Sequence, residues 1–278
     1  MSARARVPGV LLLGVAIVAG FALVGALAGV LAPYDPHAIA GPSLAGPGGD
    51  HLLGTNDSGQ DILSQLIWGA RSSGVVALLS ASLAVAIGVL VGASAGLRRG
   101  LVDVVAMRIT DVFLAVPALP LLILVVALAG PSRTTVVFVI ALAAWPSIAR
   151  IVRSQTLSIA RRGYVDAARG FGAPPRYVIR RHLLPAVGPL VAANFVYWAA
   201  SAVLLQSGLA FLGLSDPTEV SWGGVLNRAL EHQGVYVTSQ WASSVLPPGL
   251  AITLAALGLA FIGLGLEPRS DLRLERVR

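Results

Sequence analysis

Six stretches of the chain contain no charged side chain over 16 to 30 residues, and they constrain the fold more than any other feature. They cover residues 10–32, 73–97, 112–131, 134–149, 186–215 and 241–266. About 20 apolar residues in an α-helix cross a hydrocarbon layer of roughly 30 Å. Only the fourth run is shorter, and Arg133 and Arg150 can snorkel from its two ends. We therefore predict an all-α, polytopic membrane protein with six transmembrane helices.

The composition excludes several classes of protein. Hydrophobic residues make up 56% of the 278 residues and charged residues only 12%, which argues against a soluble or disordered chain. All 20 basic residues are Arg, and without Lys the chain cannot form a Walker A phosphate loop. Without Cys it has no disulfide, zinc thiolate or cysteine nucleophile. The net charge of +7 would suggest nucleic acid in a soluble protein, but we expect no nucleic-acid partner here.

The Arg residues are unevenly distributed between the two sides of a six-span chain. With the N-terminus in the cytoplasm, 17 of the 20 lie inside, and only Arg71, Arg133 and Arg228 lie outside. The positive-inside rule therefore predicts that both termini are cytoplasmic. Residues 1–9 and 267–278 are then cytoplasmic ends. Residues 10–32 are predicted to form a retained first helix, because their apolar run is longer than that of a cleaved signal peptide.

The connections between the apolar runs divide the rest of the chain. Residues 33–72 form a predicted extracytoplasmic loop, whose second half, residues 62–70, is expected to be a short amphipathic helix on the outer surface. Residues 73–266 form the predicted five-helix core, which includes the cytoplasmic residues 150–185. The outer connection that follows the fifth run is expected to contain another surface helix.

The cytoplasmic connection, residues 150–185, has the most informative pattern. It carries eight Arg and the helix breaker Gly-Ala-Pro-Pro at residues 172–175, which predicts two short helices, with Pro174 or Pro175 opening the second. Adsorption to anionic lipid would explain the charge. The small side chains of Ala167 and Ala168, followed by a sharp corner, favour instead a short helix that docks in a groove of a partner.

Two other patterns could carry chemistry. Residues 92–96, Gly-Ala-Ser-Ala-Gly, match the nucleophile pattern of serine hydrolases, with His182 as the nearest candidate base for Ser94. That pattern requires a strand-to-helix turn, whereas these residues lie in an apolar run, so an intramembrane hydrolase is kept only as an alternative. The histidines show no pair at the spacing of metal ligands, which argues against a metal site.

A polar stripe in the fifth apolar run is a candidate for a translocation path. Asn194, Trp198 and Ser201 share one face of a helix, and polar residues at this depth usually face other protein or water. Hydrogen bonding between helices is the alternative for Asn194. A self-contained carrier would also need such a path, so it remains a further alternative.

Residues 164–185 resemble the signature of the membrane subunits of ATP-binding-cassette (ABC) importers, E-A-A-x-x-x-G, nine residues, then I-x-L-P. Asp stands here in place of Glu, and His in place of Ile. The resemblance implies the type I ABC importer permease fold and a helix that couples the chain to an ATPase. The residues that match or flank the signature are Tyr164, Asp166, Ala167, Ala168, Arg169, Gly172, His182, Leu184 and Pro185.

Further segments look like the C-type permeases of the dipeptide, oligopeptide and nickel group. They are residues 51–61, 69–71, 107–111, 211–214 and 221–223. The outer segments suggest contact with a binding protein, and structural packing of the outer surface explains them equally well. The candidate contact residues are Gly54, Thr55, Asp57, Asp61 and Trp222.

The resemblance also implies a set of partners and a location. The partners would be a second homologous permease subunit, two ABC ATPase subunits, an extracytoplasmic binding protein and the lipid of the cell membrane. The chain would form half of a path for di- or oligopeptides, with a nickel chelate or another small solute as the alternative. It would catalyse nothing and bind no cofactor, because ATP and Mg²⁺ would be used by the ATPase subunits.

Overall fold

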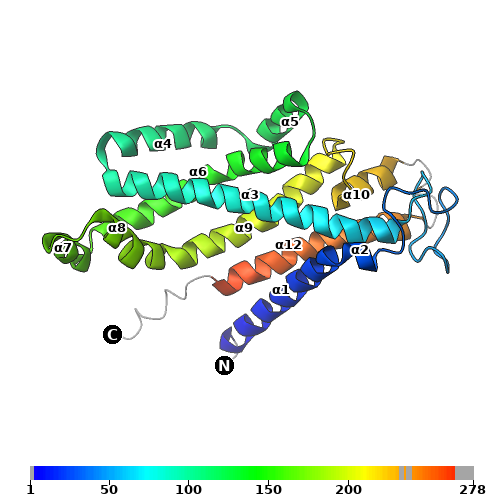
Figure 1. The fold of residues 1–278 in the computed structure, drawn as a ribbon, viewed down its shortest axis with the longest axis horizontal. Helices are drawn as coiled ribbons and strands as arrows, with labels where there is room; N and C mark the ends of the chain where they lie inside the picture. The colour runs from blue at the N-terminus through cyan, green and yellow to red at the C-terminus, as the bar shows by residue number, and fades with distance from the viewer. Residues whose placement is uncertain (1–2, 232–234, 236–239, 267–278) are drawn as a thin grey trace.

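The computed structural model describes residues 3–231, 235 and 240–266 as a bundle of helices (Figure 1). Within these residues the only β contact is an isolated bridge between Thr55 and Asp61. The helices are α1 (Ala3–Ala26), α2 (Ala28–Leu31), α3 (Ile62–Arg98), α4 (Gly100–Ala115), α5 (Ala118–Ala129), α6 (Arg133–Ala160), α7 (Gly163–Gly170), α8 (Pro175–Val178), the π-helix η1 (Ile179–Leu183), α9 (Leu184–Phe211), α10 (Trp222–Glu231), α11 (Trp241–Ser244) and α12 (Leu246–Leu266). The predicted tail, residues 267–278, lies outside the described residues.

Five helical segments in the described chain are long and apolar enough to cross a membrane, and α4 with α5 would make a sixth, broken span. This confirms the all-α, multi-span fold. Residues 112–131 do not form one continuous helix, because α4 ends at Ala115, α5 begins at Ala118, and the two helices are bent by 87°. The break lies at Val116 and Pro117, both of which have extended backbone. Proline disfavours helical geometry in the residue before it and offers no N–H to continue the hydrogen bonds.

Two other helices run further than predicted. Residues 62–70 form the first turns of α3 instead of a separate surface helix, because Asp61 caps the helix and no breaker separates it from the apolar run. The short fourth run lies in α6, which continues without a break to Ala160, so residues 150–160 extend this helix instead of forming a separate one. In α6, 61% of the most apolar window is buried, the largest share among the candidate spans.

The elements are arranged so that the connections gather at two ends of the bundle. The turn between α3 and α4 and the helices α7 and α8 lie at one end, while the start of α1 and the last turn of α12 lie nearer the middle of the long axis (Figure 1). Residues 33–61 and α10 lie at the other end. The first end carries the Arg-rich segments, and its assignment to the cytoplasm remains a prediction from the positive-inside rule.

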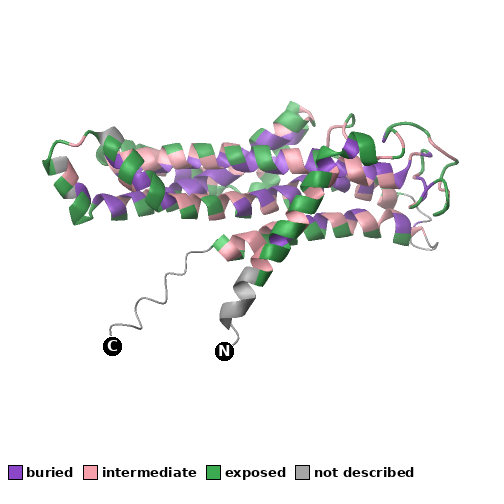
Figure 2. Cartoon of the chain, turned by 60° about the horizontal axis from the view of Figure 1, so that its bottom comes forward, coloured by how far each residue is buried: buried purple, intermediate pink, exposed green. Residues whose placement is uncertain are grey.

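The central pair of helices is α3 and α6, which approach closely through glycine. A Cβ placed on Gly88 would lie 2.6 Å from Cβ of Ile148, and one on Gly92 would lie 2.3 Å from the carbonyl oxygen of Ala149. Gly96 has a similar contact with Thr156. Buried residues follow the inner faces of the helices, while much of α1 is exposed (Figure 2). Helices in lipid associate through such close packing.

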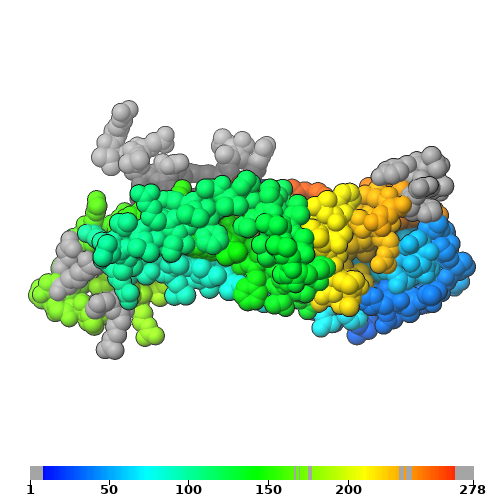
Figure 3. All heavy atoms as spheres, turned by 90° about the horizontal axis from the view of Figure 1, so that it is seen from above, coloured from blue at the N-terminus to red at the C-terminus, as the bar shows by residue number. Residues whose placement is uncertain are grey.

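The helices α4 and α5 cover one broad face of the bundle (Figure 3). Two ion pairs hold α4 against α6. Arg153 is bound by both carboxylate oxygens of Asp103, with Nη2 2.6 Å from Oδ2, and Arg150 lies 2.6 Å from Asp111. Most of the apolar side chains of α4 are exposed, and besides these pairs the ring of Phe113 packs edge-on against Trp145 of α6, with centroids 5.4 Å apart.

We expect Gly92→Ala to destabilise the bundle. The added methyl would collide with the backbone of α6, and overpacking of this kind costs about 1–3 kcal/mol. Gly74→Ala, also in α3, meets open space and should be neutral or slightly stabilising, because Ala favours a helix over Gly. Thermal denaturation of the two variants in nanodiscs measures both effects. Equal denaturation midpoints for Gly92→Ala and Gly74→Ala would contradict the importance of this contact.

Candidate functional site at the α7–α8 hairpin

The segment that matches the importer signature forms a hairpin, which we call the α7–α8 hairpin (residues 163–178). Its sharp corner comes from the end of α7. The N–H of Phe171 donates to the carbonyl of Ala167 (3.0 Å), the N–H of Ala173 donates to that of Ala168 (3.0 Å), and Gly172 has φ +81°. This is the Schellman arrangement, in which a residue in the left-handed region ends the helix. Pro175 opens α8, as the sequence predicts.

The hairpin is anchored by a few apolar side chains. Val165 of α7 and Val178 of α8 are almost completely buried, and both pack in the cluster that contains Ile159 and Val152 of α6. Leu183 of η1 joins the same cluster. Through this shared cluster the hairpin packs on the C-terminal end of α6 and the N-terminal end of α9.

The opposite side of the hairpin is exposed. Phe171 is 93% exposed, and Tyr164 and Tyr177 are about half exposed. Ala167 is exposed and Ala168 partly so. The side chains of Asp166 and Arg169, also predicted for this site, lie outside what the structure describes. An exposed apolar ring next to small residues is a feature of protein interaction surfaces.

His182 connects the two arms of the hairpin to η1. Its ring centroid lies 5.2 Å from that of Tyr164 and 5.7 Å from that of Tyr177. The backbone around it is a π-turn, in which the N–H of Leu184 donates to the carbonyl of Ile179. Pro185 follows at the start of α9. Single π-turns occur frequently at functional sites.

The structure thus brings together most of the predicted coupling residues and adds others. Tyr164 and Gly172 lie in the hairpin, and His182 of η1 packs against the ring of Tyr164. Sequence reasoning missed the anchors Val165 and Val178. Their signal was weak, because each lies in a very short apolar stretch bounded by charged residues or glycine.

Comparison with known proteins identifies the family of this helical bundle. Residues 88–276 match the family described as binding-protein-dependent transport system inner membrane component. The chain belongs to this family. This confirms the resemblance to ABC importer membrane subunits and places the permease in a membrane that it crosses several times.

Relatives of known name are similar to the permease over most of its length. A putative peptide permease protein of Brucella suis is 36% identical over 87% of this chain and 80% of its own length. A putative peptide transport system permease protein of Brucella abortus is 36% identical over 91% of this chain and 86% of its own length. The dipeptide transport system permease protein DppC of Bacillus subtilis is 32% identical over 89% of this chain and 78% of its own length.

The hydrolase alternative finds no support in the geometry around Ser94. This residue lies inside the continuous helix α3, where no strand-to-helix turn exposes it, and its hydroxyl donates to the carbonyl of Val91 (2.9 Å). The neighbouring Gly92 and Gly96 are explained by the packing of α3 on α6. The glycine-serine pattern therefore reflects helix packing.

The predicted polar stripe lies on α9, and its polar groups bond within their own helix. Asn194 donates to the carbonyl of Leu190 (2.9 Å) and Ser201 to that of Tyr197 (3.0 Å). Trp198 packs against the cluster under the hairpin. A role in a translocation path remains a prediction. The described residues also include four buried side chains with a polar atom that has no hydrogen-bond partner, and the sequence did not point to them. They are Ser73, Ser80, Gln206 and Ser207.

At the other end of the permease, Asp61 is the centre of a buried polar cluster. Its carboxylate accepts from the N–H and the hydroxyl of Ser64 (2.8 and 2.7 Å), and its other oxygen lies 3.0 Å from Nδ1 of His51. The ring of His51 in turn contacts Tyr34, with centroids 5.0 Å apart. The cluster fixes the loop of residues 33–61 to the start of α3.

The other candidate contact residues at this end are mostly buried as well. Gly54 has φ +79°, and a Cβ there would lie 2.3 Å from the carbonyl oxygen of Ala45. Thr55 is buried, and Trp222 donates from its indole to the carbonyl of Leu66 (2.9 Å). Only Asp57 of the five is exposed. Burial gives the other four a structural role, and contact with a binding protein is untested.

A polar cavity of about 250 Å³ lies beside this cluster, and the sequence analysis did not predict it. It is lined by groups that include Asp216, Glu219 and Arg228. Glu219 pairs with Arg133 at 2.6 Å. The hydroxyl of Thr218, which bonds Asp216, and the nearby Arg133 lower the pKa of Asp216 below its ordinary value, so this carboxylate is ionised at neutral pH.

We expect Gly172→Ala to loosen the end of α7 without any steric clash. A Cβ at this position meets open space, so the only cost is the left-handed backbone, about 1–2 kcal/mol. Amide hydrogen exchange over residues 167–173 should become roughly fivefold faster or more. Gly170→Ala, which is also in open space but without positive φ, is the control. Unchanged exchange in Gly172→Ala would contradict the capping role.

We also expect Asp61→Ala to destabilise the permease by about 3 kcal/mol. It removes the cap of α3 and leaves the buried His51 and Ser64 without their acceptor. The exposed Asp57→Ala should change the thermal midpoint little. If both variants denature at the wild-type temperature, the Asp61 cluster does not stabilise this end.

Proposed function

We propose that this permease is a membrane subunit of an ATP-driven ABC importer and forms half of a translocation path for di- or oligopeptides. The observation that supports this most is the α7–α8 hairpin of this chain, which belongs to the permease family. Its helix α7 is capped by Gly172 and anchored by Val165, and the hairpin exposes Phe171 and Ala167. The peptide substrate rests on the relatives, which are named as peptide and dipeptide permeases.

The hairpin would be the coupling helix, seated in a cleft of an ATPase subunit. The permease contains no Lys, so it cannot form a Walker A loop, and the energy must come from another chain. ATP and Mg²⁺ would be used there, and the permease would be non-catalytic. Small side chains such as Ala167 and Ala168 permit close approach of the two chains.

Movement would pass from the hairpin into the membrane through two helices. The first is α6, whose end packs against Val165, and the second is α9, which follows the π-turn of η1. Since α6 contacts α3 through glycines, a tilt of α6 would shift α3 as well. A second homologous permease subunit would supply the other half of the path, and an extracytoplasmic binding protein would deliver the solute.

We expect Ala168→Arg to abolish uptake while the permease stays in the membrane. A long charged side chain in a docking surface of small residues would weaken ATPase binding, by about tenfold or more. Uptake of a labelled dipeptide and a labelled nickel chelate, together with copurification of the ATPase, measures the effect and the solute. Gln155→Arg, exposed on α6 outside the hairpin, is the control.

Two results would contradict this proposal. One is wild-type uptake by an abundantly inserted Ala168→Arg permease, which would remove the coupling role. The other is uptake in vesicles that contain the permease alone, which would indicate a self-contained carrier. Uptake of the nickel chelate and of no peptide would leave the coupling role intact and change the solute.

A further inference from the structure

A cavity of about 360 Å³ lies between α1 and α3 near the α2 end of the bundle. The two helices cross at Gly25, where a Cβ would lie 3.0 Å from Cα of Arg71. Further along, α1 packs instead against α12, and a Cβ on Gly14 would lie 2.6 Å from the carbonyl oxygen of Gly258. The helices α1 and α3 therefore diverge from their crossing and leave a wedge between them.

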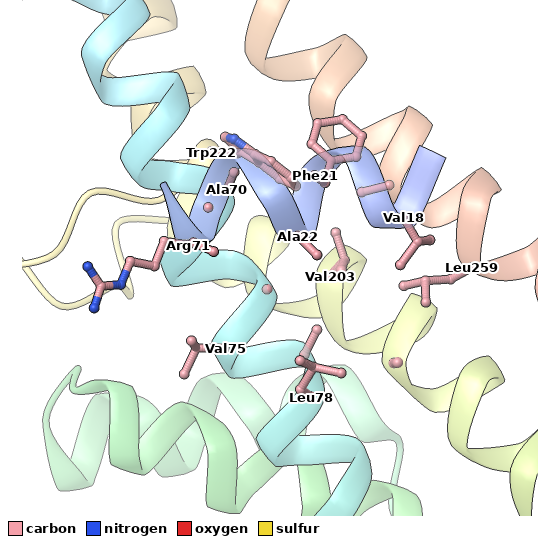
Figure 4. Close-up of a pocket in the computed structure, with 16 residues that line it drawn as sticks. Val18, Phe21, Ala22, Ala70, Arg71, Val75, Leu78, Val203, Trp222 and Leu259 are labelled. Atoms are coloured by element: carbon pink, nitrogen blue, oxygen red, sulfur yellow. The ribbon is translucent and has the colours of Figure 1, made fainter. Parts of the chain in front are cut away.

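The interior of this cavity is apolar. Figure 4 shows Val18, Phe21 and Ala22 of α1 on one side and Val75 and Leu78 of α3 on another. The indole N–H of Trp222, which also lines it, already donates to the carbonyl of Leu66. Water would find few hydrogen-bond partners in such a space, whereas an acyl chain would gain dispersion contacts.

The rim of the cavity carries a single charged residue, Arg71, whose side chain points away from the interior (Figure 4). Its guanidinium lies 5.5 Å from the ring centroid of Trp68. The other two Arg predicted for this side are engaged: Arg133 pairs with Glu219 at 2.6 Å, and Arg228 donates to Gln60 at 2.7 Å. Within the described residues, no carboxylate pairs with Arg71.

The position of Arg71 matches the depth of lipid phosphates. It lies two residues before the charge-free run of residues 73–97, and Trp68 beside it is of the type that gathers at the membrane interface. A guanidinium can bind a phosphate through two parallel hydrogen bonds. The cavity and its rim thus present an apolar slot with a phosphate-binding group at its mouth.

We propose that this cavity binds one phospholipid, with an acyl chain between α1 and α3 and the phosphodiester on Arg71. A second permease chain could also cover an apolar wedge, but it would have to bring an acidic group to Arg71. A phospholipid brings the chain and the phosphate together. Bound in this way, it fills the space that would otherwise separate α1 from α3.

Native mass spectrometry of the full-length permease, released from nanodiscs of phosphatidylglycerol and phosphatidylethanolamine, tests this site. We expect one phospholipid to be retained by the wild type and lost in Gly74→Leu, because the new side chain would enter the cavity and its Cβ would meet no atom within 4 Å. The matched control is Gly20→Leu, also in open space on exposed α1 but outside the cavity lining. Arg71→Gln should lower retention by about tenfold, and Arg108→Gln, an exposed Arg elsewhere, should not.

A photoreactive residue in place of Leu78 distinguishes the two occupants in native membranes, because this side chain is exposed at the cavity. Crosslinks to phospholipid support the proposal. Crosslinks to a second permease chain, or equal phospholipid retention in Gly74→Leu and the wild type, would overturn it.

Discussion

The close contact of α3 with α6 determines where the rest of the permease can lie. Lipid offers no hydrophobic force that drives helices together, so surfaces that fit closely must hold them. Gly88, Gly92 and Gly96 provide that fit, and with it the most enclosed span of the bundle. Because α6 continues past the apolar run to Ala160, the same contact also positions the hairpin that follows.

The Arg-rich connection, residues 150–185, has two different tasks in the folded permease. Arg150 and Arg153 face α4 and pair with Asp111 and Asp103. These two cations hold a helix whose apolar side chains are largely exposed, so they are not available for adsorption to anionic lipid. At the hairpin the ring of Phe171 and small side chains protrude, and Arg161, Arg162, Arg180 and Arg181 are exposed on either side of it. An exposed apolar ring is a feature of protein interaction surfaces.

The sequence predicts the class of fold well and the ends of the helices less well. A charge-free run marks the residues that must be kept from water. A helix continues beyond that run until a helix-breaking residue or a cap ends it, which is why α3 and α6 are longer than their runs. Proline is ambiguous for the same reason. Pro146 lies inside α6 among buried neighbours that keep the helix intact, whereas Pro117 lies between exposed residues and ends one.

The two ends of the bundle differ in a way that only the folded chain reveals. The signature near Gly172 could be located from spacing, since its contacts are local. The roles of Asp61 and Trp222 could not, because Trp222 bonds to a carbonyl 156 residues away and Asp61 meets His51 across a loop. These contacts tie together the end that holds residues 33–61, while the hairpin at the opposite end leaves Phe171 exposed. In the proposed coupling mechanism, a bundle fixed at one end and free at the other would let a force applied at α7 tilt its spans instead of moving the whole molecule.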